Sequence, residues 1–237
     1  MENIVFLIAS FFAAIAATLA GFGSSTLLVP VATMFMDLKT AIFLVACFHL
    51  FSNTFKIKLF WNKIDLNIFL LFGIPSICFA LIGAALISIV PVDVVKSILA
   101  VFLIVFSLYS LVKPRFVIKK TRSSAFIGGG LSGFLAGLIG LGGAIRSTFL
   151  VAFDMPKEIY IGTSAMIAFV IDLTRIPAYL FVKIVQDTSY YMLIPFMFIS
   201  AYLGVKTGKI LLQKISQQTF RKIVLIALFF IGIKMLF

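Results

Sequence analysis

Four ionisable side chains, His49, Arg146, Asp172 and Arg175, interrupt long apolar segments of this chain. A charge held inside the hydrocarbon core of a membrane is costly, and such a residue marks a functional site by default. Arg146 is the most informative, because a planar guanidinium suits oxyanions such as sulfonate, carboxylate or phosphate. We predict that Arg146 contacts an anionic ligand; the alternative is a structural pairing, for which Asp172 is the candidate partner.

Asp172 and Arg175 lie three positions apart on one predicted helix, so they share a face. We expect them to pair with each other or with neighbours. The functional alternatives are that Arg175 guides an anion or that Asp172 titrates and carries a coupling proton. Thr163 and Ser164 lie earlier in the same segment, where their hydroxyls either bind the ligand or bond back to the helix backbone.

His49, the only histidine, precedes Asn53 by four positions, which places both on one helical face. It is either a hydrogen-bonded core residue or a group that binds the ligand or relays protons. Lys56 and Lys58 lie nearer the end of this segment, and we expect both to extend their amines to the membrane surface.

A glycine-rich break occurs twice, each time inside a long apolar segment, and the breaks lie 119 positions apart (21 to 140). The first reads Gly21-Phe22-Gly23-Ser24-Ser25, and the second reads Gly140-Leu141-Gly142-Gly143-Ala144. Irregular backbone survives in a bilayer only where protein buries it or it lines a cavity, so paired breaks point to a transporter's binding site. Helix N-termini at the breaks would offer N–H groups to an anion. The alternative is that these small residues only permit tight helix packing.

Composition places all of these residues in a membrane. The chain is 62% hydrophobic and 12% charged, whereas a soluble domain carries about twice that charge. Apolar runs of about 20 residues predict transmembrane helices, here at 40–58, 66–89, 92–112, 158–182, 188–211 and 218–236. The net charge of +12 lies mostly in loops, where it sets membrane orientation, so nucleic acid is not an expected partner.

Each broken segment, 4–36 and 125–153, either crosses the membrane once with a kink or folds back as a hairpin. Hairpins place most lysines and arginines outside the spans on one side, whereas kinked crossings divide them evenly. The positive-inside rule therefore favours hairpins, with both termini on the non-cytoplasmic side.

The expected fold is an all-α integral membrane protein built from two inverted repeats of about five segments each. The repeats are 1–112 and 125–237, joined by a basic cytoplasmic connector at 113–124. At the offset of the two breaks, Asn53 falls opposite Asp172 and Lys56 opposite Arg175. Together the repeats form one transport domain, with a site expected near the bilayer midplane.

The two glycine breaks, the run Thr26-Leu27-Leu28-Val29-Pro30 and the segment Ile161-Gly162-Thr163-Ser164-Ala165 resemble the TauE/SafE family of sulfite exporters. The resemblance covers nearly the whole chain. It implies transport of sulfite, sulfoacetate or a related organosulfur anion. The chain departs from the family pattern where Ser24 and Ser25 occupy glycine positions, and where Phe149 stands opposite Pro30.

We therefore predict a secondary transporter or exporter of a small sulfur-containing anion, in the inner (plasma) membrane. A negative cell interior drives a monoanion outward by about 2.3 kcal/mol per 100 mV. A passive anion channel is the main alternative, and a membrane-embedded enzyme is disfavoured because the chain has one histidine and one deep acid. No metal or other cofactor is expected, and a homo-oligomer is compatible with the sequence. The predicted substrate-binding set is Gly21, Gly23, Ser24, Ser25, His49, Asn53, Gly140, Gly142, Gly143, Arg146, Thr163, Ser164 and Arg175.

Overall fold

The computed structural model describes residues 2–20, 23–112, 118–153, 155–185, 187–211 and 217–236, and within them it is helical with no strands. The α-helices are α1 (Glu2–Ala20), α2 (Ser24–Ala32), α3 (Leu38–Leu59), α4 (Leu66–Ile89), α5 (Val92–Val112), α6 (Arg122–Ile139), α7 (Gly142–Ala152), α8 (Lys157–Phe181), α9 (Ile194–Leu211) and α10 (Gln217–Leu236). Two 3₁₀ turns, η1 (Trp61–Lys63) and η2 (Thr188–Leu193), precede α4 and α9. The all-α prediction is confirmed.

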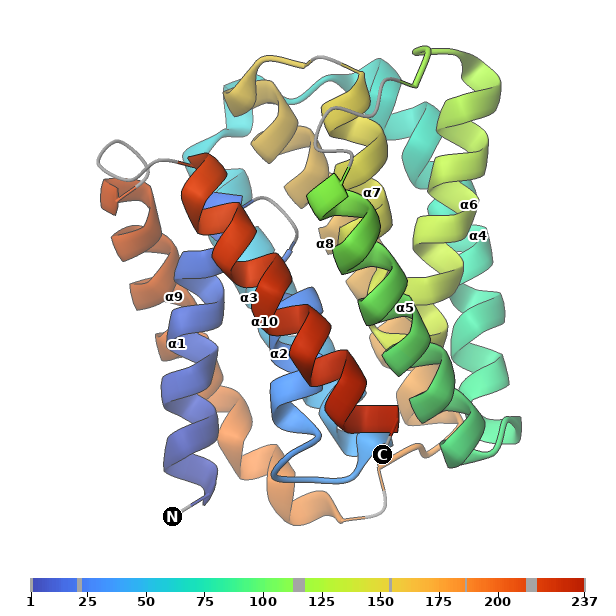
Figure 1. Cartoon of the computed structure of the whole chain (residues 1–237), viewed down its shortest axis with the longest axis vertical. Helices are drawn as coiled ribbons and strands as arrows, with labels where there is room; N and C mark the ends of the chain where they lie inside the picture. The colour runs from blue at the N-terminus through green and yellow to red at the C-terminus, as the bar shows by residue number, and fades with distance from the viewer. Residues whose placement is uncertain are drawn as a thin grey trace.

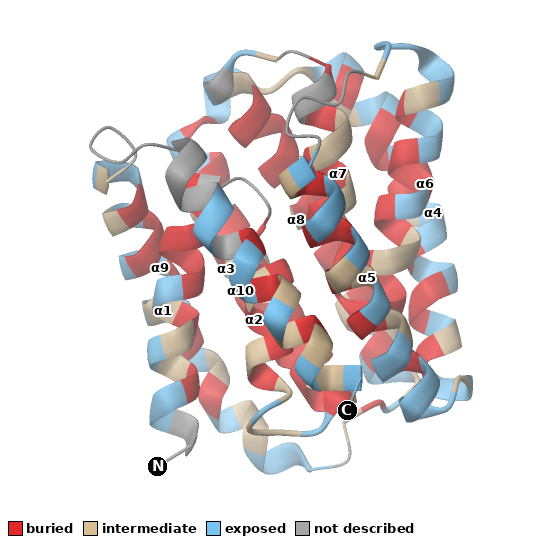
Figure 2. Cartoon of the chain, in the orientation of Figure 1, coloured by how far each residue is buried: buried red, intermediate tan, exposed pale blue. Residues whose placement is uncertain are grey.

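Five stretches of the described chain are long and apolar enough to cross a membrane: Leu38–Leu59, Leu66–Ile89, Val92–Val112, Glu158–Phe181 and Thr188–Leu211. They agree with five predicted spans to within two residues at each end. The sixth prediction, 218–236, falls on α10, in which the apolar stretch Leu225–Leu236 is shorter. Exposed residues lie on the outer faces of the bundle (Figure 2), and many of them are large and apolar, as a lipid-facing surface requires.

Both glycine-rich breaks end one helix and begin another. The chain turns back at each break, so α1 with α2 and α6 with α7 form hairpins rather than kinked crossings (Figure 1). The return helices have 9 and 11 residues, and at 1.5 Å per residue each spans about half of a bilayer core. The hairpins enter from opposite ends of the molecule, and α1 begins at the end where α10 finishes (Figure 1).

Glycine is required at the turns themselves. Gly140 has a φ of 77° and ends α6 in the left-handed region, where its N–H bonds to the carbonyl of Ala136 and the N–H of Leu141 bonds to that of Leu135. Gly23 has a φ of 81° and directly precedes α2. Side chains other than glycine rarely adopt such angles. The start of α6 differs from prediction, because a capping box of Thr121 and Ser124 begins the helix at Arg122, inside the predicted connector.

Each hairpin packs against a helix of the other half through glycines. On α6, Gly129, Gly133 and Gly137 lie so close to α4 that a Cβ on any of them would overlap an α4 carbonyl. On α9, Gly204 approaches the carbonyl of Phe11 on α1 in the same way, and Gly208 lies against Thr18 of α1. Such contacts bring helix backbones together in a membrane, where water exclusion does not drive association.

The main helix contacts of one half have counterparts in the other half. Pairs α3–α8, α5–α10 and α2–α7 join helices at equivalent positions of the two halves, and α1–α9 is matched by α6–α4. Exchanging α1–α5 for α6–α10 therefore turns this set of contacts into itself. Two structural repeats require such a symmetry, and the inverted repeats 1–112 and 125–237 stay a prediction.

Candidate anion-binding site

The two breaks meet in the interior of the bundle. A Cβ built on Gly23 would lie 3.4 Å from Cα of Gly143, 3.3 Å from Nε2 of His49 and 3.7 Å from a terminal guanidinium nitrogen of Arg146. The start of α2, the start of α7 and two basic side chains thus converge on one point. Gly23 provides no side-chain cap for α2, and the first N–H groups of a helix have no partner within it. Gly21, which the sequence also assigns to the site, lies outside the described residues.

Arg146 lies on α7, one turn from the break, and its side chain is 3% exposed. Its Nε donates a hydrogen bond of 3.0 Å to Oγ of Ser164 on α8. Within the described part of the chain, no carboxylate lies within 4.0 Å of its guanidinium. The structural alternative, a pairing with Asp172, is therefore wrong.

Lys56 on α3 is also inside the bundle, with only 5% of its surface exposed. The prediction that it extends to the membrane surface is wrong for Lys56, whereas Lys58 is exposed. Lys56 lines the same small cavity as Arg146. The sequence held a signal for this position, because His49, Asn53 and Lys56 follow the i, i+4, i+7 spacing of one helical face.

Asp172 is held by partners on both sides. Its Oδ1 accepts from Nε of Arg175 at 2.8 Å and lies 2.7 Å from Nη2, and its Oδ2 lies 2.7 Å from Nδ1 of His49. Arg175 also donates to the carbonyl of Ala136, and the hydroxyl of Tyr179 donates to the same carbonyl. The expected pairing of Asp172 with Arg175 is confirmed, and this pairing leaves Arg175 engaged in structure.

The other predicted residues divide between the cavity and the framework. Asn53 and Ser164 line the cavity, and Ser24 and Ser25 are buried in the first turn of α2. Thr163 instead accepts a hydrogen bond of 2.9 Å from the backbone N–H of Asp65, so it fixes the start of α4. Gly140 makes the turn after α6, and Gly142 packs on the carbonyl of Ser132, as the packing alternative for the breaks proposed.

The cavity at this point is small, about 20 Å³, which is room for about one water molecule. Its lining residues are Ala17, Gly23, Asn53, Lys56, Arg146, Tyr160, Ile161, Ser164 and Ala165. Among the described residues, buried polar atoms without a hydrogen-bond partner include Oγ of Ser24, Nε2 of His49 and Nδ2 of Asn53. Such atoms are costly to leave unpaired, so they favour a polar ligand here.

The electrostatics of the site favour an anion. Asp172 is the carboxylate of the group, and Arg175 offsets its charge. The charges of Arg146 and Lys56 therefore remain in excess next to two helix N-termini, which add partial positive charge. A buried charge is normally paired, so this group of residues needs a counter-anion.

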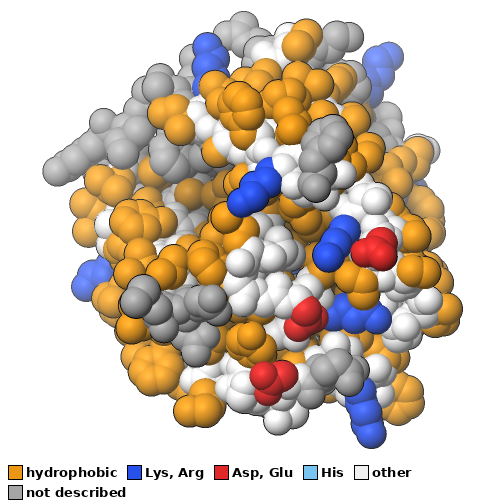
Figure 3. Space-filling model, turned by 60° about the horizontal axis from the view of Figure 1, so that its bottom comes forward, with side chains coloured by type: hydrophobic (Ala, Val, Ile, Leu, Met, Phe, Trp, Pro, Cys, Tyr) orange, Lys and Arg blue, Asp and Glu red, His pale blue; other side chains and the backbone are white. Residues whose placement is uncertain are grey.

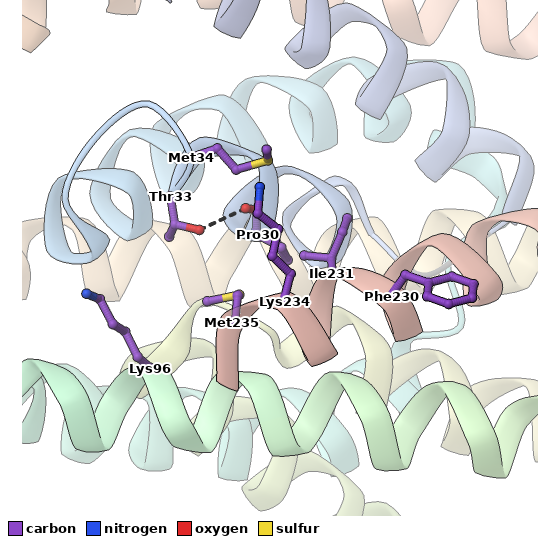
Figure 4. A pocket seen from close by; sticks show the side chains of 8 residues that line it. All are labelled: Pro30, Thr33, Met34, Lys96, Phe230, Ile231, Lys234 and Met235. Carbon is purple, nitrogen blue, oxygen red and sulfur yellow. Dashed lines mark hydrogen bonds between the residues drawn. The ribbon is translucent and has the colours of Figure 1, made fainter. Parts of the chain in front are cut away.

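A second and larger cavity, about 480 Å³, lies between the end of α2, the start of α5 and the end of α10. Figure 4 shows the side chains of Lys96 and Lys234 on two of these helices, with Pro30 of α2 and Thr33, the residue that follows α2, on the third side. Because α2 begins at the meeting point of the breaks and ends at this cavity, one short helix connects the two places.

Facing helix breaks inside an all-helical, multi-pass bundle, with buried cations beside them, define the membrane-transporter class of protein. The chain belongs to the sulfite exporter TauE/SafE family, whose sequence profile matches residues 6–235. The resemblance seen in the glycine motifs is thereby confirmed, and the family indicates export of sulfite or a related sulfur anion. No individually curated protein matches the chain.

Proposed function

We propose that this protein is a secondary transporter that exports a small sulfur oxyanion, sulfite or an organosulfonate, across the plasma membrane. The anion binds between the N-termini of α2 and α7, with Arg146 and Lys56 as its charged ligands. The observation that carries this proposal is Arg146, a buried guanidinium with no carboxylate beside it among the described residues. Its planar donors match the geometry of an oxyanion.

The small cavity has a functional meaning under this proposal. A space of about 20 Å³ is too small for sulfite, so the conformation described is closed around the site. Binding and release then require the hairpins to move relative to α3 and α8, as alternating access does around a fixed site. The larger cavity with Lys96 and Lys234 is the vestibule through which the anion leaves.

The direction follows from charge. A negative interior drives a monoanion outward by about 2.3 kcal/mol per 100 mV, so export needs no coupling ion. Uptake would require one.

The test is sulfite flux in proteoliposomes with Arg146→Gln. Losing a charged hydrogen-bond donor costs about 1.5–3 kcal/mol, so the apparent affinity for sulfite should fall roughly ten- to hundredfold. Arg122→Gln is the matched control, since Arg122 is exposed at the start of α6, and it should leave flux unchanged. Unaltered sulfite and sulfonate flux in Arg146→Gln would refute the assignment of the site.

A further inference from the structure

The hydrogen bond between His49 and Asp172 fixes which nitrogen of the imidazole carries the proton. Nδ1 of His49 lies 2.7 Å from Oδ2 of Asp172. Asp172 also receives two donors of Arg175 on Oδ1, as an ionised carboxylate does, and an ionised carboxylate can only accept. Nδ1 must therefore be the donor, so the proton of a neutral imidazole is on Nδ1.

Burial, together with the excess of cations around the site, favours a neutral His49 while the site holds no anion. The charged groups that act on His49 are Arg146 from α7 and Asp172 and Arg175 from α8, and Lys56 lies two turns further along α3 and is buried in the same interior. Asp172 supplies one negative charge, and Arg175 already offsets it. A protonated imidazole would add a further positive charge to a buried group that has cations in excess, which low-dielectric surroundings penalise.

Nε2 of a neutral imidazole with its proton on Nδ1 is a bare acceptor. This atom is buried and has no hydrogen-bond partner among the described residues. It lies at the Gly23 position, within 3.3 Å of the point where a Cβ would stand, and the Arg146 guanidinium approaches the same point to 3.7 Å. The other basic groups at this point are donors, so among the basic nitrogens of the described residues there Nε2 has the opposite requirement.

A fully deprotonated oxyanion presents only lone pairs, so it would satisfy Arg146 and Lys56 but would face Nε2 lone pair to lone pair. An anion with one hydrogen satisfies all three. Building on the proposed function, we propose that the bound anion is sulfite sharing one proton with Nε2 of His49, so that the transported species is hydrogensulfite rather than the sulfite dianion or an organosulfonate, whose sulfonate group carries no proton. Nε2 of His49 accepts the hydrogen bond from the protonated substrate, and Asp172 positions the His49 ring.

The proton balance is the same by either route. Hydrogensulfite brings its own proton, whereas sulfite dianion binds together with one proton taken from water at Nε2. In both cases the complex gains one anion and one proton, and the same monoanion leaves. Transport then moves a single negative charge per sulfite, which a negative interior drives outward.

The experiment uses the fact that His49 is the only histidine of the chain. Nitrogen NMR of histidine-labelled, untagged protein reports the tautomer and protonation of this one ring. Without sulfite, the spectrum should show a neutral ring with its proton on Nδ1. With saturating sulfite, the chemical shift of Nε2 should move to the range of a hydrogen-bonded or protonated nitrogen. A free ring with its proton on Nε2, or an Nε2 signal that sulfite leaves unchanged, would overturn the inference.

Calorimetry in alkaline buffers of different ionisation heats gives an independent readout on the same protein. Wild type should take up about one proton for each sulfite bound, and His49→Gln should take up none. Sulfite binding without proton uptake in wild type, or uptake that persists in His49→Gln, contradicts the inference even where the proposed function holds. If wild type neither binds nor transports sulfite or a sulfonate, the proposed function itself fails, whereas the tautomer measurement without ligand still tests the role of Asp172.

Discussion

At the scale of single residues, two lysines on α3 that look alike in sequence have opposite environments. Lys56 is 5% exposed and lines the small cavity, and Lys58, half a turn away, is exposed. Because a helix turns by 3.6 residues, a shift of two positions places a side chain on the opposite face. Lys58 can therefore reach the membrane surface, whereas Lys56 is directed at the site.

We expect Lys56→Gln to weaken sulfite transport and Lys58→Gln to leave it unchanged. Glutamine keeps most of the length of the side chain but removes the charge, so a bound anion loses one charged ligand, worth about 1.5–3 kcal/mol. The apparent affinity in proteoliposome flux should fall roughly ten- to hundredfold. If Lys56→Gln transports sulfite with the same apparent affinity as wild type and Lys58→Gln, then Lys56 does not bind the anion.

The interior network shows where sequence reasoning stops at this scale. The pairing of Asp172 with Arg175 could be predicted, because residues three apart on a helix share a face. The contact of Asp172 with His49 could not, since it joins α3 to α8 across 123 positions. The repeat offset placed Asn53 opposite Asp172, and the actual partner is one turn earlier on the same face. Periodicity identified the face, but only helix packing determines the partner.

At the scale of helices, the stripe of glycines on α6 determines how close the second hairpin comes to α4. Gly129, Gly133 and Gly137 recur every four residues and touch the α4 backbone. Oγ of Ser76 on α4 donates 2.9 Å across this interface to the carbonyl of Gly129. Since α6 leads directly into the break before α7, its position on α4 also sets the position of Arg146.

Gly133→Ala should lower the melting temperature of the detergent-solubilised protein, because its Cβ would overlap the carbonyl of Ser76. Overpacking of this kind costs about 1–3 kcal/mol. The control is Gly130→Ala on the same helix, whose Cβ would meet the Phe79 ring at an ordinary 3.4 Å. Alanine there should be neutral or stabilising by up to about 1 kcal/mol. If both variants melt alike, backbone contact is not what joins α6 to α4.

The helices and hairpins themselves could be predicted from the sequence. Long apolar runs gave the spans, and the uneven distribution of basic residues distinguished hairpins from kinks, because that distribution depends on how often the chain crosses. The sequence offered two alternatives for the glycines of the breaks, a ligand site or helix packing. The structure shows glycines of both kinds: Gly23 and Gly143 face the site, whereas Gly140 forms the turn and Gly142 packs against α6.

At the scale of the whole molecule, the two ends of the bundle differ in charge. The end where α1 begins and α10 finishes carries both acidic and basic side chains (Figure 3). Asp187 caps the start of η2, and the hydrogen bonds from Ser189 hold its pKa below its ordinary value. At the other end Lys58, Lys206 and Lys209 line one groove, Lys120 pairs with Asp65, and Lys63 pairs with Glu158.

This asymmetry predicts the orientation in the membrane. The positive-inside rule places the lysine-rich end in the cytoplasm, so the starts of α1 and α5 and the end of α10 face outward, and with them the vestibule of Lys96 and Lys234. Alkaline phosphatase folds only outside the cytoplasm, so a fusion after α10 should be active, and a fusion in the connector at 113–121 should be inactive. A green fluorescent protein at the same two positions should give the reverse pattern. An active phosphatase in the connector would show that the protein has the opposite orientation in the membrane. The cavity between α2, α5 and α10 would then be the entrance for the anion from the cytoplasm rather than its exit.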